Sequence, residues 1–210
     1  MSARIEQLVT SGTFSLDGQT FDVENNVWLI GNDEEVLVLD APHDAAAIEA
    51  AVAGRRVVAI ACTHAHDDHV RVAPELAERI SAPVLLHRED RELWDLTHPS
   101  AKPDGELSDG MTLEVAGVTL TVLHTPGHAP GAVCLSAPSL GVVFTGDTLF
   151  CGGPGATGRS FSDYPTILDS IRTRLFTLAP ETRVLTGHGE ETTVAAEAPS
   201  YDAWVSRLSD

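Results

Sequence analysis

Three histidines and two aspartates lie within residues 63–69, whose sequence is Thr-His-Ala-His-Asp-Asp-His. The segment directly follows an apolar run that predicts a buried strand, and binding sites are often built where strands end. Imidazole and carboxylate groups are ligands that suit zinc, iron, manganese or cobalt. If the strand geometry continues, residue alternation turns His64 and His66 to the same side, so both can reach one ion. Asp68 and His69 then point elsewhere and can hold a second ion.

Three later segments place a histidine or an aspartate beside a glycine directly after an apolar strand. They are residues 124–128 (His-Thr-Pro-Gly-His), 145–148 (Thr-Gly-Asp-Thr) and 186–189 (Thr-Gly-His-Gly). Glycine permits the tight backbone turns that such segments need. A single histidine in a turn is usually structural, and residues 63–69 taken alone could be a polar loop that caps the next helix. Four strand ends of the same design indicate a shared metal centre instead.

The arrangement of these residues resembles the metallo-β-lactamase superfamily over most of the chain. The matching pattern is His64-x-His66-x-Asp68-His69, then His128, Asp147 and His188. Within the superfamily, residues 124–128 and residues 144–150 (Phe-Thr-Gly-Asp-Thr-Leu-Phe) look like hallmarks of the glyoxalase II branch, the hydroxyacylglutathione hydrolases. The resemblance implies an α/β fold, in which a four-layer αβ/βα sandwich of two mixed β-sheets is flanked by helices and carries the metals at one edge.

The resemblance also implies two divalent metal ions as cofactors, with zinc expected ahead of iron or manganese. The implied ligands are His64, His66 and His128 for the first ion, Asp68, His69 and His188 for the second, and Asp147 as the bridge between them. Asp68 is also expected to act in catalysis. Asp40, which ends the strand expected at residues 35–39, matches an acidic position that steadies ligands in this family.

The chemistry that follows from such a centre is hydrolysis. Two divalent cations that share a water acidify it, giving hydroxide near neutral pH, and one cation polarises the carbonyl that the hydroxide attacks. No protein nucleophile is needed, which fits the absence of a Gly-x-Ser-x-Gly elbow from the sequence. A thiolate leaves readily because the pKa of a thiol is about 8.5. The sequence therefore predicts a metal-dependent hydrolase of small-molecule acyl thioesters of a low-molecular-weight thiol.

Other functions remain open at this point. A persulfide dioxygenase of the same branch would hold one iron with His64, His128 and Asp147. Hydrolysis of β-lactams is disfavoured because Asp147 departs from the ligand sets of those enzymes, and a non-catalytic binding module would be expected to have lost ligands. Only 22 residues follow His188, so the helical domain that holds glutathione in glyoxalase II enzymes is not expected. The thiol could be glutathione, mycothiol or another carrier.

The loop after the third segment raises two further questions. Residues 153–158 match Gly-x-Gly-x-x-Gly, but they do not lie in a βαβ unit, so dinucleotide binding is not indicated. The loop is expected to bring flexible backbone near the substrate. Arg159 either binds an anionic group of the substrate or forms a structural salt bridge. Cys151, four residues after Asp147, either approaches the groove with a role in catalysis or, as the favoured alternative, packs in the core as a small residue.

The elements that must position these residues are short and β-rich. Apolar runs predict strands at residues 26–30, 35–39, 56–61, 83–86, 111–115, 118–123, 132–135, 141–144 and 182–185. The first two are expected to form a hairpin with which the chain opens, and the last is expected to be the final strand. Helical spacing and caps predict helices at residues 44–52, 72–80 and 89–96, from Pro165 onward, and at residues 203–208.

Length and composition define the setting. The 210 residues, 43% of them hydrophobic, predict one metallo-β-lactamase-fold domain over residues 1–210. Thirteen basic and thirty-one acidic side chains give a net charge of −18, which disfavours nucleic acid and anionic membranes as partners. The longest apolar run, residues 57–62, is far below the roughly 20 residues of a membrane span. Three cysteines and a start without signal-peptide character indicate a cytoplasmic setting, and the oligomeric state stays open.

Overall fold

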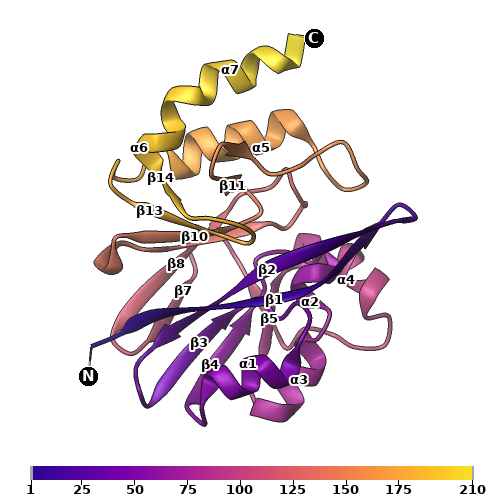
Figure 1. The fold of residues 1–210 in the computed structure, drawn as a ribbon, viewed down its shortest axis with the longest axis vertical. Coiled ribbons are helices and arrows are strands. Elements are labelled where there is room, and N and C mark those ends of the chain that lie inside the picture. The colour runs from indigo at the N-terminus through magenta and orange to yellow at the C-terminus, as the bar shows by residue number, and fades with distance from the viewer. Residues whose placement is uncertain (1, 210) are drawn as a thin grey trace.

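Two six-stranded β-sheets, packed face to face, form the middle of the molecule in the computed structural model, which describes residues 2–209 (Figure 1). The first sheet has the strand order β1-β2-β3-β4-β5-β6, and the second has the order β14-β13-β10-β9-β8-β7. Strands β11 and β12 form a separate small ribbon. Each sheet mixes parallel and antiparallel neighbours, because β3, β4, β5 and β6 run parallel in the first sheet and β10 and β13 in the second.

The strands are β1 (Arg4–Leu16), β2 (Gln19–Gly31), β3 (Glu35–Leu39), β4 (Arg56–Ala61), β5 (Val84–His87), β6 (Gly105–Leu107), β7 (Thr112–Val115), β8 (Val118–His124), β9 (Val133–Ala137), β10 (Val142–Gly146), β11 (Leu149–Phe150), β12 (Gly153–Pro154), β13 (Arg183–Thr186) and β14 (Thr192–Thr193). The α-helices are α1 (Ala45–Val52), α2 (Asp67–Val70), α3 (Ala73–Ile80), α4 (Arg91–Thr97), α5 (Tyr164–Ser170), α6 (Val194–Glu197) and α7 (Tyr201–Ser206). Short 3₁₀ turns and one π-helical turn, Ile171–Leu175, join them.

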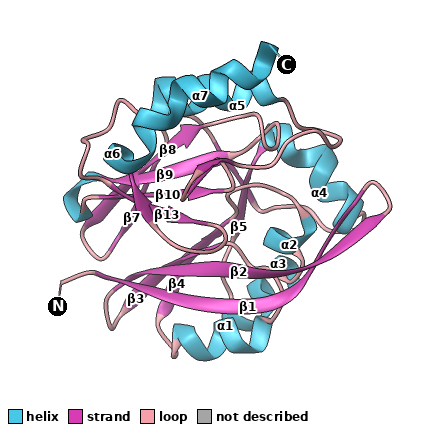
Figure 2. Cartoon of the chain, turned by 45° about the horizontal axis from the view of Figure 1, so that its top comes forward, coloured by secondary structure: helices cyan, strands magenta, loops and turns pink. Residues whose placement is uncertain are grey.

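The core has three layers of apolar contacts, and these explain the sandwich. Between the sheets, residues such as Trp28 of β2 and Phe144 of β10 pack with ring centroids 6.0 Å apart. On the outer side of the first sheet, Ile48 of α1 and Leu76 of α3 are fully buried. On the outer side of the second, α5 and α7 pack over strands β9, β10 and β13, and Trp204 of α7 is almost fully buried there (Figure 2). These layers confirm the expected four-layer α/β sandwich.

Most of the predicted elements lie where the sequence indicates. The side chain of Asp44 accepts a hydrogen bond of 2.9 Å from the backbone amide of Ala47 and so caps α1, which ends at a left-handed Ala53 just before Gly54. Helix α5 begins after Asp163, which caps it in the same way, with proline in its first turn.

Two expectations about the strands were wrong, and strand β1 was not expected at all. The chain opens with the long hairpin of β1 and β2, which turns at Asp17 and Gly18, and not with the hairpin of residues 26–30 and 35–39. The latter pair does form, as the antiparallel neighbours β2 and β3. The last strand is β14 and not β13. Strand β1 was missed because most of its residues are partly or fully exposed, so its sequence shows little alternation of apolar and polar residues.

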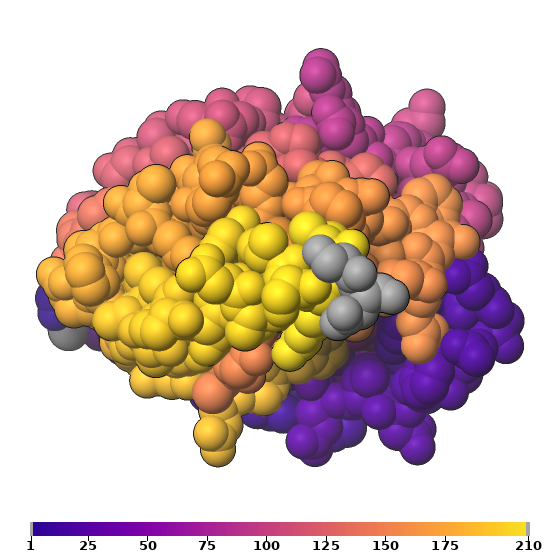
Figure 3. All heavy atoms as spheres, turned by 90° about the horizontal axis from the view of Figure 1, so that it is seen from above, coloured from indigo at the N-terminus to yellow at the C-terminus, as the bar shows by residue number. Residues whose placement is uncertain are grey.

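The C-terminal segment packs on the second sheet's side of the molecule. Seen from above, the yellow C-terminal residues lie against the orange segment that contains α5 (Figure 3). The hydroxyl of Tyr164 donates a hydrogen bond of 3.1 Å to the carbonyl of Trp204, which fixes α7 against α5. None of the helices formed by the described residues has both the length and the apolar character required to cross a membrane.

Candidate metal centre

Four strands end at the same edge of the sandwich, and the loop after each carries candidate ligands. These strands are β4, β8, β10 and β13. The first loop continues into the short helix α2, and the others carry His128, Asp147 and His188. Strand ends that meet at one edge of α/β sheets commonly form binding sites. The four segments singled out in the sequence therefore come together in space.

The first group of donors consists of His64, His66 and His128. Nδ1 of His66 lies 3.0 Å from Nε2 of His64 and 2.9 Å from Nε2 of His128. All three rings are buried. Burial lowers the pKa of each, that of His66 to about 3, so the imidazoles are neutral near pH 7. Three neutral nitrogens that face one another match the donors that a divalent transition metal needs.

The second group consists of Asp68 and His69 of α2 and His188 of the loop after β13. Nε2 of His188 lies 3.2 Å from Nε2 of His69 and 3.3 Å from Oδ2 of Asp68. Burial lowers the pKa of His188, but the charge of Asp147 and the hydrogen bonds with Asp147 and Asp68 outweigh it and raise the value to about 10. The pKa of His69 is raised well above its usual range for similar reasons, against the effect of burial. The carboxylates around these two rings therefore favour a positive charge at this position, which protons supply in the metal-free protein and a divalent ion would supply when bound.

Asp147 lies between the two groups. Its Oδ2 is 3.5 Å from Nε2 of His128 and 3.3 Å from Nε2 of His188, and its Oδ1 is 3.3 Å from Nε2 of His69. Burial would raise the pKa of this carboxyl, but the neighbouring His188 and His69 hold it well below its usual range. Oδ1 is buried, and among the described residues it has no hydrogen-bond partner. An ionised oxygen of this kind in a histidine cluster fits the position of a ligand shared by two ions.

Three of the candidate histidine ligands are fixed by a hydrogen bond at Nδ1, the ring nitrogen that faces away from the centre. Nδ1 of His69 lies 2.8 Å from Oδ2 of Asp40. Nδ1 of His128 is 2.8 Å from the carbonyl of Ala156, and Nδ1 of His188 is 2.7 Å from the carbonyl of Glu24. Carbonyl and carboxylate oxygens accept hydrogen bonds here, so each of these Nδ1 atoms donates and each Nε2 is the ring nitrogen that faces the centre. Such support is typical of metal-binding histidines, and the residues present fit two divalent ions.

Asp40 itself has a backbone that few residues would tolerate. Its φ of 64° lies in the left-handed region, and its carboxylate also accepts hydrogen bonds of 2.7 and 2.8 Å from the amide and hydroxyl of Thr63. Aspartate is among the residues that adopt this conformation with least cost. The strain is compensated by the contacts that place the carboxylate behind His69.

The sequence analysis missed Asn25, which touches the second group. Its side-chain amide donates to Oδ2 of Asp68 at 3.1 Å and lies 3.3 Å from Nε2 of His69, while its Oδ1 lies 2.8 Å from Nε2 of His43. Asn25 is fully buried in β2. A polar side chain at the start of an apolar strand is the only sequence signal for it, and many solvent-facing positions share that signal.

Two other expectations concern the loop after β11. Cys151 is exposed and does not pack in the core, because it lies in the turn between β11 and β12. Arg159 makes no salt bridge with any described residue. Its guanidinium instead lies over the rings of Phe14 and Phe21. The structural salt bridge, one of the two expectations for this residue, is therefore absent among the described residues.

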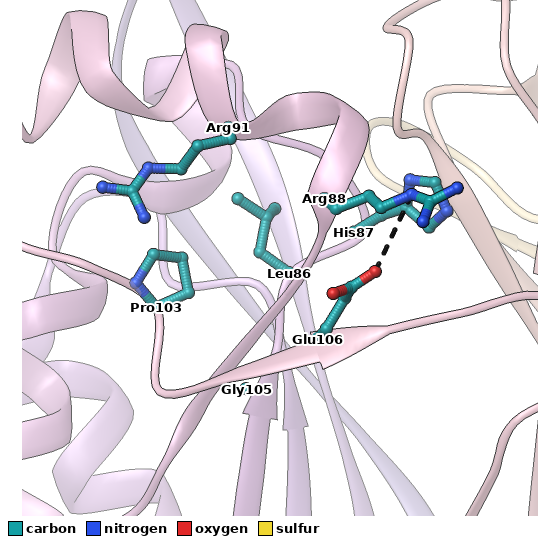
Figure 4. Close-up of a pocket in the computed structure, with 7 residues that line it drawn as sticks. All are labelled: Leu86, His87, Arg88, Arg91, Pro103, Gly105 and Glu106. Atoms are coloured by element: carbon teal, nitrogen blue, oxygen red, sulfur yellow. Dashed lines mark ion pairs between the residues drawn. The ribbon is translucent and has the colours of Figure 1, made fainter.

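A cavity of about 380 Å³ lies apart from the candidate ligands (Figure 4). Its lining residues are Leu86, His87, Arg88, Arg91, Pro103, Gly105 and Glu106. Two of these residues, Arg88 and Glu106, form an ion pair of 3.9 Å. None of the seven ligand candidates lines it, so this cavity is separate from the metal centre.

Comparisons with known proteins agree with the geometry. The family model of the metallo-beta-lactamase superfamily matches residues 21–188. The probable metallo-hydrolase YqgX of Bacillus subtilis is 33% identical over 189 residues, which cover 83% of this chain and 90% of that protein. Hydroxyacylglutathione hydrolase GloC of Haemophilus influenzae is 34% identical over 151 residues, which cover 66% of this chain and 71% of that protein.

Solved structures are similar as well. The BLEG-1 B3 metallo-beta-lactamase has a TM-score of 0.77 at 30% identity, covering 90% of this chain and 97% of that chain. The protein TTHA1623 in a di-iron-bound form has a TM-score of 0.74 at 33% identity, covering 90% and 96%. The names of these similar proteins include a hydroxyacylglutathione hydrolase and a metallo-beta-lactamase. The shared fold therefore does not define one substrate.

Proposed function

The chain belongs to the metallo-β-lactamase superfamily, a superfamily of metallohydrolases, and on that premise we propose that it hydrolyses acyl thioesters of a small thiol with two divalent metal ions. The observation that carries the proposal is the position of Asp147, within 3.5 Å of a histidine nitrogen of each donor group. Such a carboxylate suits two ions better than one. When bound, the two ions would acidify a water molecule and polarise the substrate carbonyl.

Other residues around the centre orient the water and the ligands. Burial would raise the pKa of Asp68, but His69 and His188 lower it to about 2, so its carboxylate is ionised near pH 7. Asn25 donates to Oδ2 of this carboxylate and fixes its orientation. We assign Asp68 the catalytic role of orienting the attacking water. The carbonyl of Ala156 and the carboxylate of Asp40 keep Nε2 of His128 and of His69 turned inward.

The leaving group supports thioesters over amides. Hydrolysis of an amide needs an acid that protonates the departing nitrogen, whereas a thiolate departs unaided because its pKa is about 8.5. The carboxyls closest to the centre, Asp68 and Asp147, both have a lowered pKa and are poor proton donors near pH 7. The similarity to GloC of Haemophilus influenzae points to the same class of substrate.

The proposal extends to cofactor and partner. Histidine and carboxylate donors accept zinc, iron or manganese, and we propose zinc as the resident ion. The partner is a small-molecule thioester, since the net charge of −18 opposes the binding of nucleic acid and of anionic membranes.

The test is a substrate panel with protein of known metal content. Thiol release from S-lactoylglutathione would be followed with a disulfide dye, beside an oxygen ester and a β-lactam of similar size. We expect the thioester to be cleaved at least tenfold faster than the other two. A protein with two ions per chain that cleaves the β-lactam or the oxygen ester and leaves thioesters intact would refute the proposed function.

A further inference from the structure

The side chain of His43 lies against the opening hairpin and contacts Asn25 of β2. It belongs to the loop between β3 and α1, one residue before Asp44, which caps α1. Its Nε2 lies 2.8 Å from Oδ1 of Asn25. An amide oxygen only accepts hydrogen bonds, so Nε2 of His43 is the atom that donates.

Asn25 turns its two polar ends to different neighbours. Its Nδ2 lies 3.1 Å from Oδ2 of Asp68, 3.3 Å from Nε2 of His69 and 3.4 Å from Nε2 of His188. Among the described residues, the ligand atoms within hydrogen-bond distance of Asn25 all belong to the second donor group. The two ends of an amide have nearly the same size, so hydrogen bonds and not packing determine which end faces the ligands.

The hydrogen bond from His43 becomes important when an ion is bound. A divalent cation attracts a carbonyl oxygen and repels the NH2 group of an amide, so its charge favours turning the amide of Asn25 around. A turned amide would place its oxygen against Oδ2 of Asp68, where two acceptors would face each other. It would also leave His43 without its acceptor. The bond from His43 therefore opposes the turn.

The ring of His43 is held in one position by β1. A Cβ added at Gly12 would overlap with Nδ1 of His43 and lie 2.8 Å from Cε1, so glycine leaves the room that the ring needs. Burial lowers the pKa of His43, so the ring is neutral near pH 7 and has one N–H. Nδ1 is buried and has no hydrogen-bond partner among the described residues. The N–H of this ring is thus committed to Asn25.

We infer that His43 is a positioning residue for the second metal ion and acts through Asn25, whose amide oxygen it holds away from the ligands. The inference rests on the two-metal part of the proposed function. The loop at residues 40–44 then supports the second donor group twice, since Oδ2 of Asp40 also lies 2.8 Å from Nδ1 of His69. Loss of His43 should weaken the second ion and leave the first in place.

The test measures the Kd of each zinc ion separately, by competition with a chromophoric chelator. His43→Leu removes the donor and should raise the Kd of the second ion about tenfold, with no change for the first. His43→Gln keeps a donor that can reach Asn25 and should restore most of the affinity. The control is Asp44→Ala, which removes the cap of α1 beside His43. It should lower thermal stability and change neither Kd.

Two further comparisons test whether His43 acts through Asn25. In an Asn25→Leu background, His43→Leu should weaken the second ion no further, because the bond between the two side chains is already absent. Gly12→Ala should weaken the second ion in wild-type protein by displacing the ring, and should have no such effect in His43→Ala, which has no ring to displace.

The outcomes separate this inference from the proposed function. If His43→Leu leaves the second Kd unchanged, weakens both ions equally, or has its full effect in the Asn25→Leu background, the inference is wrong while the proposed function stands. One ion per chain in wild-type protein would refute the two-metal function and the inference with it. Two ions with the expected effect of His43→Leu, but without thioester cleavage, would support the inference and refute the proposed substrate.

Discussion

The backbone amide of Ala65 donates a hydrogen bond of 2.7 Å to Oδ2 of Asp90, 25 residues away in the chain. Ala65 lies between His64 and His66. The other oxygen of Asp90 accepts a hydrogen bond from the backbone amide of Gly131, which lies in the loop that carries His128. One buried carboxylate thus joins the two loops that supply the first donor group.

Replacement of Asp90 should therefore weaken metal binding from a distance. Asp90→Ala leaves two buried amides without acceptors, and we expect a loss of about 1–3 kcal/mol in the free energy of unfolding. Metal retention against a chelator should fall about tenfold, because the ligand loops lose their shared anchor. The control is Asp95→Ala, at a side chain that pairs with Arg91 on the exposed side of α4. Unchanged metal retention in Asp90→Ala would show that the loops hold their positions without it.

Metal binding should release protons from the second donor group and none from the first. At pH 7 the raised pKa values of His69 and His188 keep both rings protonated in metal-free protein, whereas the lowered values of His64, His66 and His128 keep those rings neutral. Ligation requires neutral imidazole, so about two protons should leave the histidines of each chain, in addition to the proton that the acidified water loses. Calorimetric titration in buffers of different ionisation enthalpy measures this number. His188→Ala should lose the second ion, so His69 keeps its proton and the release should fall by about two protons; an unchanged number would contradict the assignment.

Metal-free protein should lose stability as the pH rises. A folded-state pKa above the unfolded value of about 6.5 means that the proton favours the folded state. For His188 this contribution is complete below pH 6.5 and is lost as the pH rises through about 10. We expect the free energy of unfolding to fall over this interval in chelator-treated protein. Asp147→Asn should flatten the fall, since Asp147 is the main source of the raised value.

The sequence predicted the ligand segments but not everything that positions them. Each segment carries polar residues after an apolar run, and this local pattern is visible without a structure. The contribution of β1 is not visible in the sequence. Most of its residues are partly or fully exposed, and its pairing with β2 shows only in the structure. Phe14 reaches His66 only through that pairing.

Asn25 and Asp90 illustrate the same limit. The sequence expected a helix over residues 89–96, and within it Asp90 looked like one more polar residue near a helix start. In the structure it is fully buried, because the loops of Ala65 and Gly131 close over it. A buried polar residue whose partners lie 18 or more positions away leaves no spacing pattern in the sequence.

Gly187 provides a geometric test of the position of Asp147. A Cβ added at Gly187 would overlap with Oδ1 of Asp147 and lie 2.9 Å from Cε1 of His69. Gly187→Ala should displace Asp147 and reduce both metal content and thioester hydrolysis by at least tenfold. Gly110→Ala is the matched control, because a Cβ there meets nothing within 4 Å although its φ of +77° adds backbone strain. If Gly187→Ala kept full activity, Asp147 would have to lie elsewhere.

The most direct test of the two-metal account is the number of metal ions per chain in wild-type protein and in His188→Ala, measured beside thioester hydrolysis and oxygen uptake with a persulfide. His188 contributes to the second donor group alone. We predict two ions in wild-type protein, about one in the variant, and at least a tenfold loss of hydrolysis, which corresponds to about 1.4 kcal/mol of barrier. A one-iron dioxygenase would need only His64, His128 and Asp147. One iron per chain and equal oxygen uptake in both proteins would contradict the account.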